Sequence, residues 1–80
     1  MEINIQLFAF LKEALGESIT LDVPSPVTAG GVRSAFLNRN PRFEPAGHSL
    51  CVAVNLEYVP DDHPVLPGQE VAIFPPVSGG

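Results

Sequence analysis

The chain has 80 residues, 45% of them hydrophobic and 16% charged, and its nine acidic and four basic residues give a net charge of −5. This composition predicts one globular domain and excludes an intrinsically disordered chain. Basic residues are scarce, so we do not expect nucleic acid as a partner. No apolar run approaches the roughly 20 residues of a membrane span, so we do not expect a membrane segment either. The N-terminus lacks the basic segment of a signal peptide and the single Cys51 cannot form an internal disulfide, so we expect a cytoplasmic protein.

Two strands are predicted near the N-terminus. Apolar and polar side chains alternate over residues 2–9 and again over residues 18–23, which is the period of a half-buried strand. Residues 11–16, closed by Gly16, have the pattern of a turn or a single helical turn. We therefore expect the two strands to form an antiparallel hairpin.

One main helix is predicted in the middle of the chain. Thr28 is a suitable N-cap. The apolar residues that follow it fall on one face at helical spacing: Ala29, Val32, Ala35 and Phe36. Gly30 and Gly31 weaken the first turn by roughly 1 kcal/mol each relative to alanine. The helix is expected to end at Asn40-Pro41, because the residue before a proline is pushed out of the α region.

The second half of the chain predicts a polar loop and further strands. The loop covers residues 42–48, residues 50–54 form an apolar run suited to a central strand, and residues 71–74 form the last strand. A turn near residues 55–57, a brief strand at Tyr58 and a type II turn at Pro67-Gly68 are expected between them. The order β-β-α-β-β predicts an α+β domain of the ubiquitin-like β-grasp class, a mixed sheet with one main helix packed on one face.

The C-terminus has the most distinctive composition of the chain. Pro75 and Pro76 stiffen the exit from the last strand, and Gly79 and Gly80 leave its tip without side chains. Extended, the six residues from Pro75 to Gly80 reach roughly 20 Å. We therefore predict a domain over residues 1–74 and a flexible tail over residues 75–80 that carries the terminal carboxylate into a pocket on another protein. The alternative is a frayed terminus without a role.

Three phenylalanines are predicted to form a partner-binding surface. Strand alternation places Phe8 and Phe10 opposite the apolar face of the first strand, and it places Phe74 opposite the apolar face of the last. Because one helix covers only one face of the sheet, we expect these rings together on the uncovered face, where aromatic patches commonly bind partners. The alternative is that loops fold over them as a small second core.

No residue in the body of the chain is predicted to be catalytic. Cys51 is interpreted as a packing residue, since nothing near it in sequence activates a thiol. His48 and His63 lie far apart without further ligands at zinc spacing, so no metal site is expected, and residues 61–63 are interpreted as a solvated loop. Any chemistry is therefore assigned to the carboxylate of Gly80.

A terminal carboxylate reacts only after it has been activated. Adenylation by ATP and magnesium on a partner enzyme provides that activation, so no cofactor is expected on this chain itself. A sulfur donor then gives a thiocarboxylate, or a cysteine or lysine gives a thioester or isopeptide. An unhindered glycine suits both routes.

Three stretches of the chain resemble the family of molybdopterin synthase small subunits: IQLFAFLKEALG, VAVNLEYVPDDHPVLPGQE and VAIFPPVSGG. The resemblance covers nearly the whole chain and implies a β-grasp sulfur carrier that is not catalytic alone. It implies that Gly80 is adenylated by an enzyme related to ubiquitin-activating enzymes and is then thiocarboxylated by a sulfur donor. It also implies a heterotetramer with a large catalytic subunit, in which the sulfur builds the molybdopterin dithiolene from cyclic pyranopterin monophosphate.

The resemblance also implies roles for individual residues. By position, Phe8, Lys12 and Phe74 match partner contacts. The inserted tail corresponds to Pro75, Pro76, Val77, Ser78, Gly79 and Gly80. The alternatives are a sulfur carrier for thiazole, cysteine or tRNA thiolation, a ubiquitin-like protein modifier joined through Gly80, and an interaction module with an idle tail.

Overall fold

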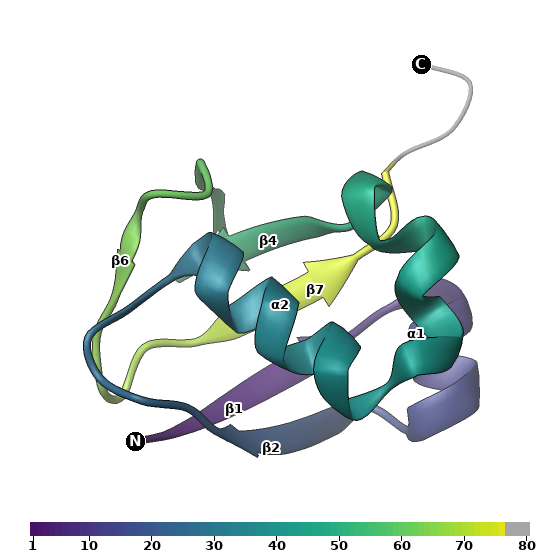
Figure 1. Ribbon diagram of the computed structural model, residues 1–80, viewed down its shortest axis with the longest axis horizontal. Coiled ribbons are helices and arrows are strands. Elements are labelled where there is room, and N and C mark those ends of the chain that lie inside the picture. Colours follow the sequence, from purple (N-terminus) through teal and green to yellow (C-terminus); the bar gives the residue numbers. More distant parts are fainter. Residues whose placement is uncertain (77–80) are drawn as a thin grey trace.

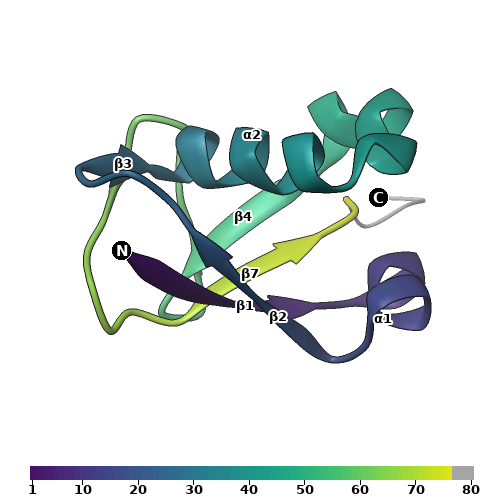
Figure 2. The same ribbon diagram turned by 60° about the horizontal axis from the view of Figure 1, so that its bottom comes forward.

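The computed structural model describes residues 1–76, apart from the side chain of His48, and shows a helical layer on one face of a mixed sheet (Figures 1 and 2). The elements in chain order are β1 (Glu2–Leu7), α1 (Ala9–Leu15), β2 (Ser18–Asp22), β3 (Val27–Thr28), α2 (Ala29–Arg39), the 3₁₀ helix η1 (Pro41–Ser49), β4 (Cys51–Val54), β5 (Glu57–Tyr58), β6 (Pro64–Val65) and β7 (Val71–Phe74). The predicted α+β β-grasp class is confirmed. No helix within residues 1–76 combines the length and apolarity needed to cross a membrane.

The main sheet joins the two ends of the chain at its centre. Its order is β2-β1-β7-β4-β5, with β1 and β7 parallel and all other neighbours antiparallel. The predicted hairpin of the first two strands is confirmed, with Ile3 opposite Leu21. β4 is paired on both sides, as its apolar run suggested, but the middle position belongs to β7. The last strand before the tail is therefore hydrogen-bonded on both sides.

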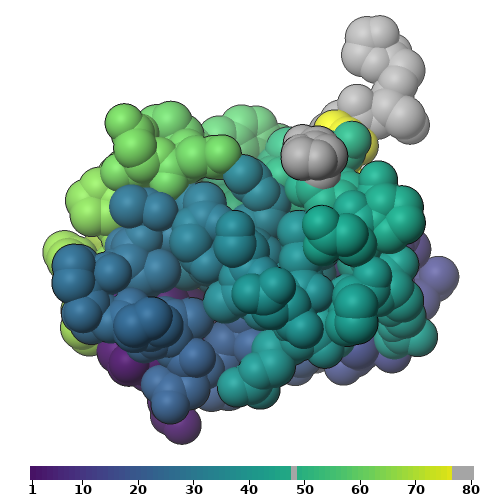
Figure 3. Space-filling model, viewed as in Figure 1, coloured from purple at the N-terminus to yellow at the C-terminus, as the bar shows by residue number. Residues whose placement is uncertain are grey.

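The core lies between this sheet and α2. Every second residue of β1 is buried, as the alternation predicted. Ala29, Val32 and Phe36 of α2 are fully buried against the sheet, while Ala35 of the predicted apolar face is half-buried. Figure 3 shows the molecule from this side, where α2 and η1 form most of the surface. The opposite face of the sheet carries no helix within residues 1–76, and the predicted contact residues Phe8 and Phe74 line a hollow there.

The start of α2 explains Gly30, one of the two glycines in its first turn. The Thr28 hydroxyl accepts a hydrogen bond from the Gly31 amide at 3.1 Å, which confirms the predicted N-cap. The Gly30 amide donates to the Asp61 carbonyl at 2.9 Å. A Cβ on Gly30 would lie 3.0 Å from the Asp61 Cβ. Glycine thus lowers helix propensity but lets the loop at Asp61 approach the end of the helix.

Residues 41–49 form η1 rather than the predicted loop. Phe43 is buried, and its ring stacks on Phe36 of α2 with centroids 6.1 Å apart. The prediction was wrong because one apolar side chain anchors an otherwise polar segment to the core. The short ladder of β3 with β6, in which Val27 faces Val65, was also missed, since two-residue strands have no visible period.

β1 ends earlier than its alternation predicted. Ala9 has φ 55°, in the left-handed region, and it begins α1 rather than continuing the strand. The predicted single turn over residues 11–16 is therefore a longer helix. This break moves Phe10 away from the face that the alternation assigned to it.

Candidate functional site

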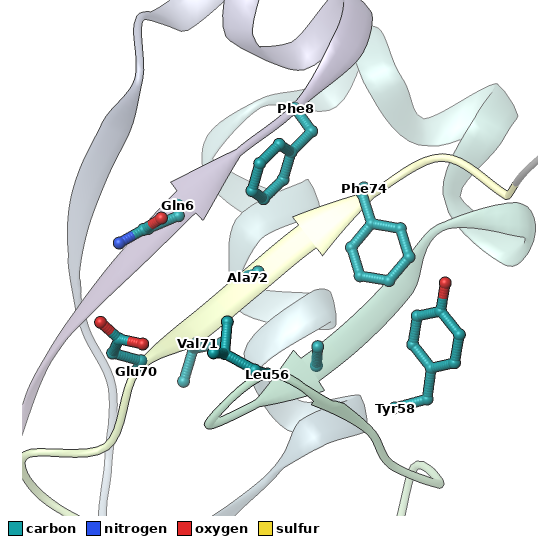
Figure 4. Close-up of a pocket in the computed structure, with 9 residues that line it drawn as sticks. Gln6, Phe8, Leu56, Tyr58, Glu70, Val71, Ala72 and Phe74 are labelled. Atoms are coloured by element: carbon teal, nitrogen blue, oxygen red, sulfur yellow. The ribbon is translucent and has the colours of Figure 1, made fainter.

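A hollow of about 260 Å³ lies on the uncovered face of the sheet (Figure 4). Its floor is formed by the small side chains Ala53 and Ala72 of the neighbouring strands β4 and β7. Its walls are Gln6, Phe8, Leu56, Tyr58, Glu70 and Phe74. The ninth lining residue is Val71, a member of the core. We call these nine residues the sheet hollow. Ala53 is buried although it faces away from α2, because larger side chains surround it.

Phe74 lies between the other two aromatic rings of the hollow. The ring centroids of Phe8 and Phe74 are 6.4 Å apart with the planes at 84°, an edge-to-face contact. Those of Tyr58 and Phe74 are 5.3 Å apart. Figure 4 shows the three rings along one side of the hollow. The structure thus brings Phe8 and Phe74 together on the uncovered face, and their role as partner contacts stays a prediction.

Phe10 does not join this cluster, so its predicted placement was wrong. Its ring lies on α1 and packs against Phe43 at 5.9 Å between centroids, and Phe43 in turn stacks on α2. The residue is 41% exposed and belongs to the helical side of the molecule. The physical reason is the left-handed backbone of Ala9, which ends the strand alternation one residue before Phe10.

Lys12 extends the candidate surface beyond the rings. It lies in α1, and its Nζ is 3.9 Å from a carboxylate oxygen of Glu17, an exposed pair of low strength. Lys12 lines a second hollow together with Phe8 and Gln6, which also line the sheet hollow. Lys12 therefore lies beside the aromatic cluster, and its role as a partner contact stays a prediction.

Sequence reasoning missed Leu56 and Tyr58 as members of the site. Tyr58 is 73% exposed and lies opposite Ala53 in the β4–β5 pair. The turn expected near residues 55–57 was the available signal. A two-residue turn at Asn55-Leu56 fixes the hairpin register and thereby places Tyr58 on the same face as Ala53. β5 is only two residues long, so its alternation is invisible in the sequence.

The tail begins at the end of the aromatic cluster. Pro75, directly after Phe74, is half-buried, and Pro76 is exposed. Val77, Ser78, Gly79 and Gly80 lie outside the described residues, so the predicted tail insertion, the reactive terminus and the domain boundary at residue 74 stay predictions.

The core does not include Cys51, which was predicted to be a packing residue. Cys51 is half-buried outside the core, with its Sγ 3.7 Å from the Ser49 carbonyl oxygen. In the described part of the chain, no three His, Cys, Asp or Glu side chains are grouped as metal ligands.

The loop over residues 61–63, predicted to be merely solvated, is tied to α2. Asp61 accepts a hydrogen bond from Arg33 at 2.5 Å. The Ala29 amide donates to the His63 carbonyl at 2.9 Å. The hydrogen bond from Arg33 holds the pKa of the Asp61 carboxyl below its usual value of 3.8, against a smaller opposing effect of desolvation.

Comparison with known proteins agrees with the resemblance seen in the sequence. The chain is 35% identical over 81 residues to the molybdopterin synthase sulfur carrier subunit of Arabidopsis thaliana, and the alignment covers 100% of this chain and 84% of that relative. It is 35% identical over 80 residues to the subunit of the same name from Escherichia coli (strain K12), covering 98% and 99%. The crystal structure of SAMP1, small archaeal modifier protein 1, from Haloferax volcanii matches with a TM-score of 0.81 and 30% identity over the whole of both chains. Residues 5–80 match the ThiS family. The chain therefore belongs to the ThiS family.

Proposed function

We propose that this chain is a sulfur carrier, the small subunit of a molybdopterin synthase. The relatives that bear this name match it along nearly its whole length. One structural observation carries the proposal furthest: β7 connects the sheet hollow directly to the tail. Phe74 is the central ring of the cluster, and the diproline follows it at once. A partner that binds the hollow therefore receives the terminus within roughly 20 Å.

The chemistry of the proposal takes place at Gly80. An activating enzyme transfers AMP from ATP to the terminal carboxylate with release of pyrophosphate, which turns a carboxylate oxygen into part of a good leaving group. Attack by hydrosulfide, supplied by a sulfide-level sulfur donor, then forms the carbon–sulfur bond, releases AMP and, with loss of a proton, leaves a thiocarboxylate. Magnesium on the activating enzyme neutralises the phosphates of ATP. This chain supplies the terminus and the docking surface, and the partner enzymes supply the catalytic groups.

The second partner in the proposal is the large catalytic subunit, in a heterotetramer. Phe8, Phe74 and Lys12 contact it, while residues 75–80 enter its active site and deliver sulfur to cyclic pyranopterin monophosphate. The dithiolene product contains two sulfur atoms, so two thiocarboxylated chains each donate one sulfur atom for every molecule formed. A reducing cytoplasm suits this chemistry and the single Cys51.

A protein modifier is the second candidate, because SAMP1 matches this chain over its full length. In that role the activated Gly80 forms an isopeptide with a lysine of another protein. Lys12 is the only lysine of the chain, so polymers of the ubiquitin kind have a single possible linkage site.

Intact-mass spectrometry separates the two candidates. The chain is incubated with the activating enzyme, ATP and a sulfur donor, with a parallel sample that lacks the donor. We expect the full reaction to add the mass difference between sulfur and oxygen at the C-terminus, and the sample without donor to keep its original mass after quenching. Addition of a whole protein mass instead indicates conjugation, and an unchanged mass in both samples contradicts the carrier role.

A further inference from the structure

The turn between β4 and β5 holds Leu56 in an unfavourable backbone conformation. It is a two-residue hairpin turn in which Asn55 has φ 52° and Leu56 has φ 69°. Two positive φ angles are the mark of a type I′ turn, whose usual sequence is Asn-Gly. Asparagine tolerates this region, whereas a bulky side chain such as leucine is disfavoured there. Glycine is thus the residue that local stability would select at position 56.

Two hydrogen bonds fix this turn against the beginning of β7. The Asn55 amide donates to the Glu70 carbonyl at 2.8 Å, and the Glu70 amide donates to the Asn55 Oδ1 at 3.0 Å. These two hydrogen bonds fix the position of the turn and place Leu56 and Glu70 side by side at one end of the sheet hollow (Figure 4). Strained residues persist where the surrounding structure holds them in this way, and they are frequently functional.

Folding gains little from the side chain of Leu56. The residue is 89% exposed and is not part of the core. It continues the apolar rim that Phe8, Tyr58 and Phe74 form at the other end of the hollow. An exposed leucine in a strained position, beside an aromatic patch, is therefore placed for binding rather than for stability.

The charge of the hollow indicates which partner it fits. Glu70 is the only charged residue among the described residues that line the sheet hollow, and the chain carries a net charge of −5. Its carboxylate makes no ion pair within residues 1–76. A second copy of this chain would bring two Glu70 carboxylates and two acidic surfaces together, which is unfavourable. The complementary surface is apolar with a basic side chain at its edge.

From these observations we infer that Leu56 is a specificity-determining contact for the large subunit, and that it enters an apolar pocket beside a basic residue that pairs with Glu70. The inference rests on the proposed function. It adds a second anchor, at the end of the sheet hollow opposite the aromatic cluster, that orients the carrier on its partner. Leucine rather than glycine at this turn then increases the affinity for the partner and lowers the stability of the fold.

The decisive variant is Leu56→Gly, because stability and binding are expected to change in opposite directions. Removal of the left-handed strain should raise the Tm by roughly 4–8 °C, the shift that corresponds to about 1 kcal/mol in a domain of this size. Loss of the anchor should weaken the affinity for the large subunit about tenfold, as measured by titration calorimetry. Leu56→Met keeps an apolar side chain on the same backbone and should leave both values near those of the wild type.

Two matched controls test the placement of the contact. Leu66 is also an exposed leucine, at 58%, but it does not line the hollow, so Leu66→Ala should leave the affinity unchanged. Glu70→Gln should lower the affinity and reduce its salt dependence. Glu57→Gln removes the same charge from the residue next to Leu56, outside the hollow, and should do neither.

The outcomes separate this inference from the function on which it rests. If the wild-type chain binds and Leu56→Gly binds equally tightly, Leu56 is not such a contact and the proposed function stands. If the Tm of Leu56→Gly falls, the leucine does not cost stability, so the inference that it is kept for binding is overturned while the proposed function stands. If the wild-type chain does not bind the large subunit at all, both are overturned. Self-association of the wild type through the hollow, seen by analytical ultracentrifugation and lost in Leu56→Gly, would also overturn the inference.

Discussion

At the scale of the residue, Phe74 is the side chain on which the aromatic cluster depends, because both Phe8 and Tyr58 contact its ring. Phe74→Ala should weaken binding to the large subunit by about 2 kcal/mol or more, since truncation of a central aromatic anchor removes contacts across the patch. The fold should remain intact, because Phe74 is only half-buried and lies outside the core. Calorimetric titration and thermal unfolding measure the two effects.

Phe10→Ala is the matched control for this variant. It removes the same side chain from the contact with Phe43, on the helical side of the molecule, and should leave the affinity nearly unchanged. An unchanged affinity of Phe74→Ala together with a large fall in Tm would assign Phe74 to the core instead.

At the scale of the element, α2 is held at its first turn by the loop that carries Asp61. The Arg33 hydrogen bond lowers the pKa of Asp61 in the folded state, so this carboxylate stabilises the fold at pH values above its unfolded pKa of about 3.8. The stabilisation is lost as the pH falls through the lower, folded-state pKa. Asp61→Asn should therefore lower the Tm at neutral pH, and its difference from the wild type should shrink below pH 4, as followed by thermal unfolding across a pH series.

Asp62→Asn is the control within the same loop. It removes the same charge from a residue that makes no ion pair within residues 1–76, so its Tm should follow the wild type at every pH. A Tm difference between Asp61→Asn and the wild type that stays constant down to pH 2 would show that the stabilisation does not come from the ionised Asp61 carboxylate.

At the scale of the whole molecule, docking and chemistry are assigned to separate parts of the chain. One alanine added after Gly80 should leave the fold and the affinity for the large subunit nearly intact, since the sheet hollow is unchanged. It should abolish sulfur transfer, because the new carboxylate lies about 3.3–3.6 Å beyond its proper place and carries a methyl group. A misplacement of roughly 1 Å already costs about a hundredfold in rate.

Product formation from the pyranopterin precursor is the assay for this extended chain, with the added alanine verified by mass. Normal turnover by the extended chain would mean that the tail is only a tether. A loss of binding together with turnover would mean that the terminus itself contributes to docking.

The sequence by itself determined the features that depend on near neighbours in the chain. The alternation of Ile3, Ile5 and Leu7 gave β1, and the hydroxyl of Thr28 gave the start of α2. The proline after Asn40 marked the end of that helix. Local sterics and local hydrogen bonds decide such features, so a short window of sequence contains the information.

Only the tertiary structure decided which side chains meet. Whether Phe10 lies on the sheet face depends on the backbone of a single residue, Ala9, and burial of Phe43 against Phe36 turned a polar segment into η1. The sheet hollow itself joins β1, β4, β5 and β7, which are far apart in the chain, and its member Leu56 lies in a conformation that its own side chain disfavours. Contacts between distant segments set these positions, because long-range packing outweighs the small preferences of individual residues.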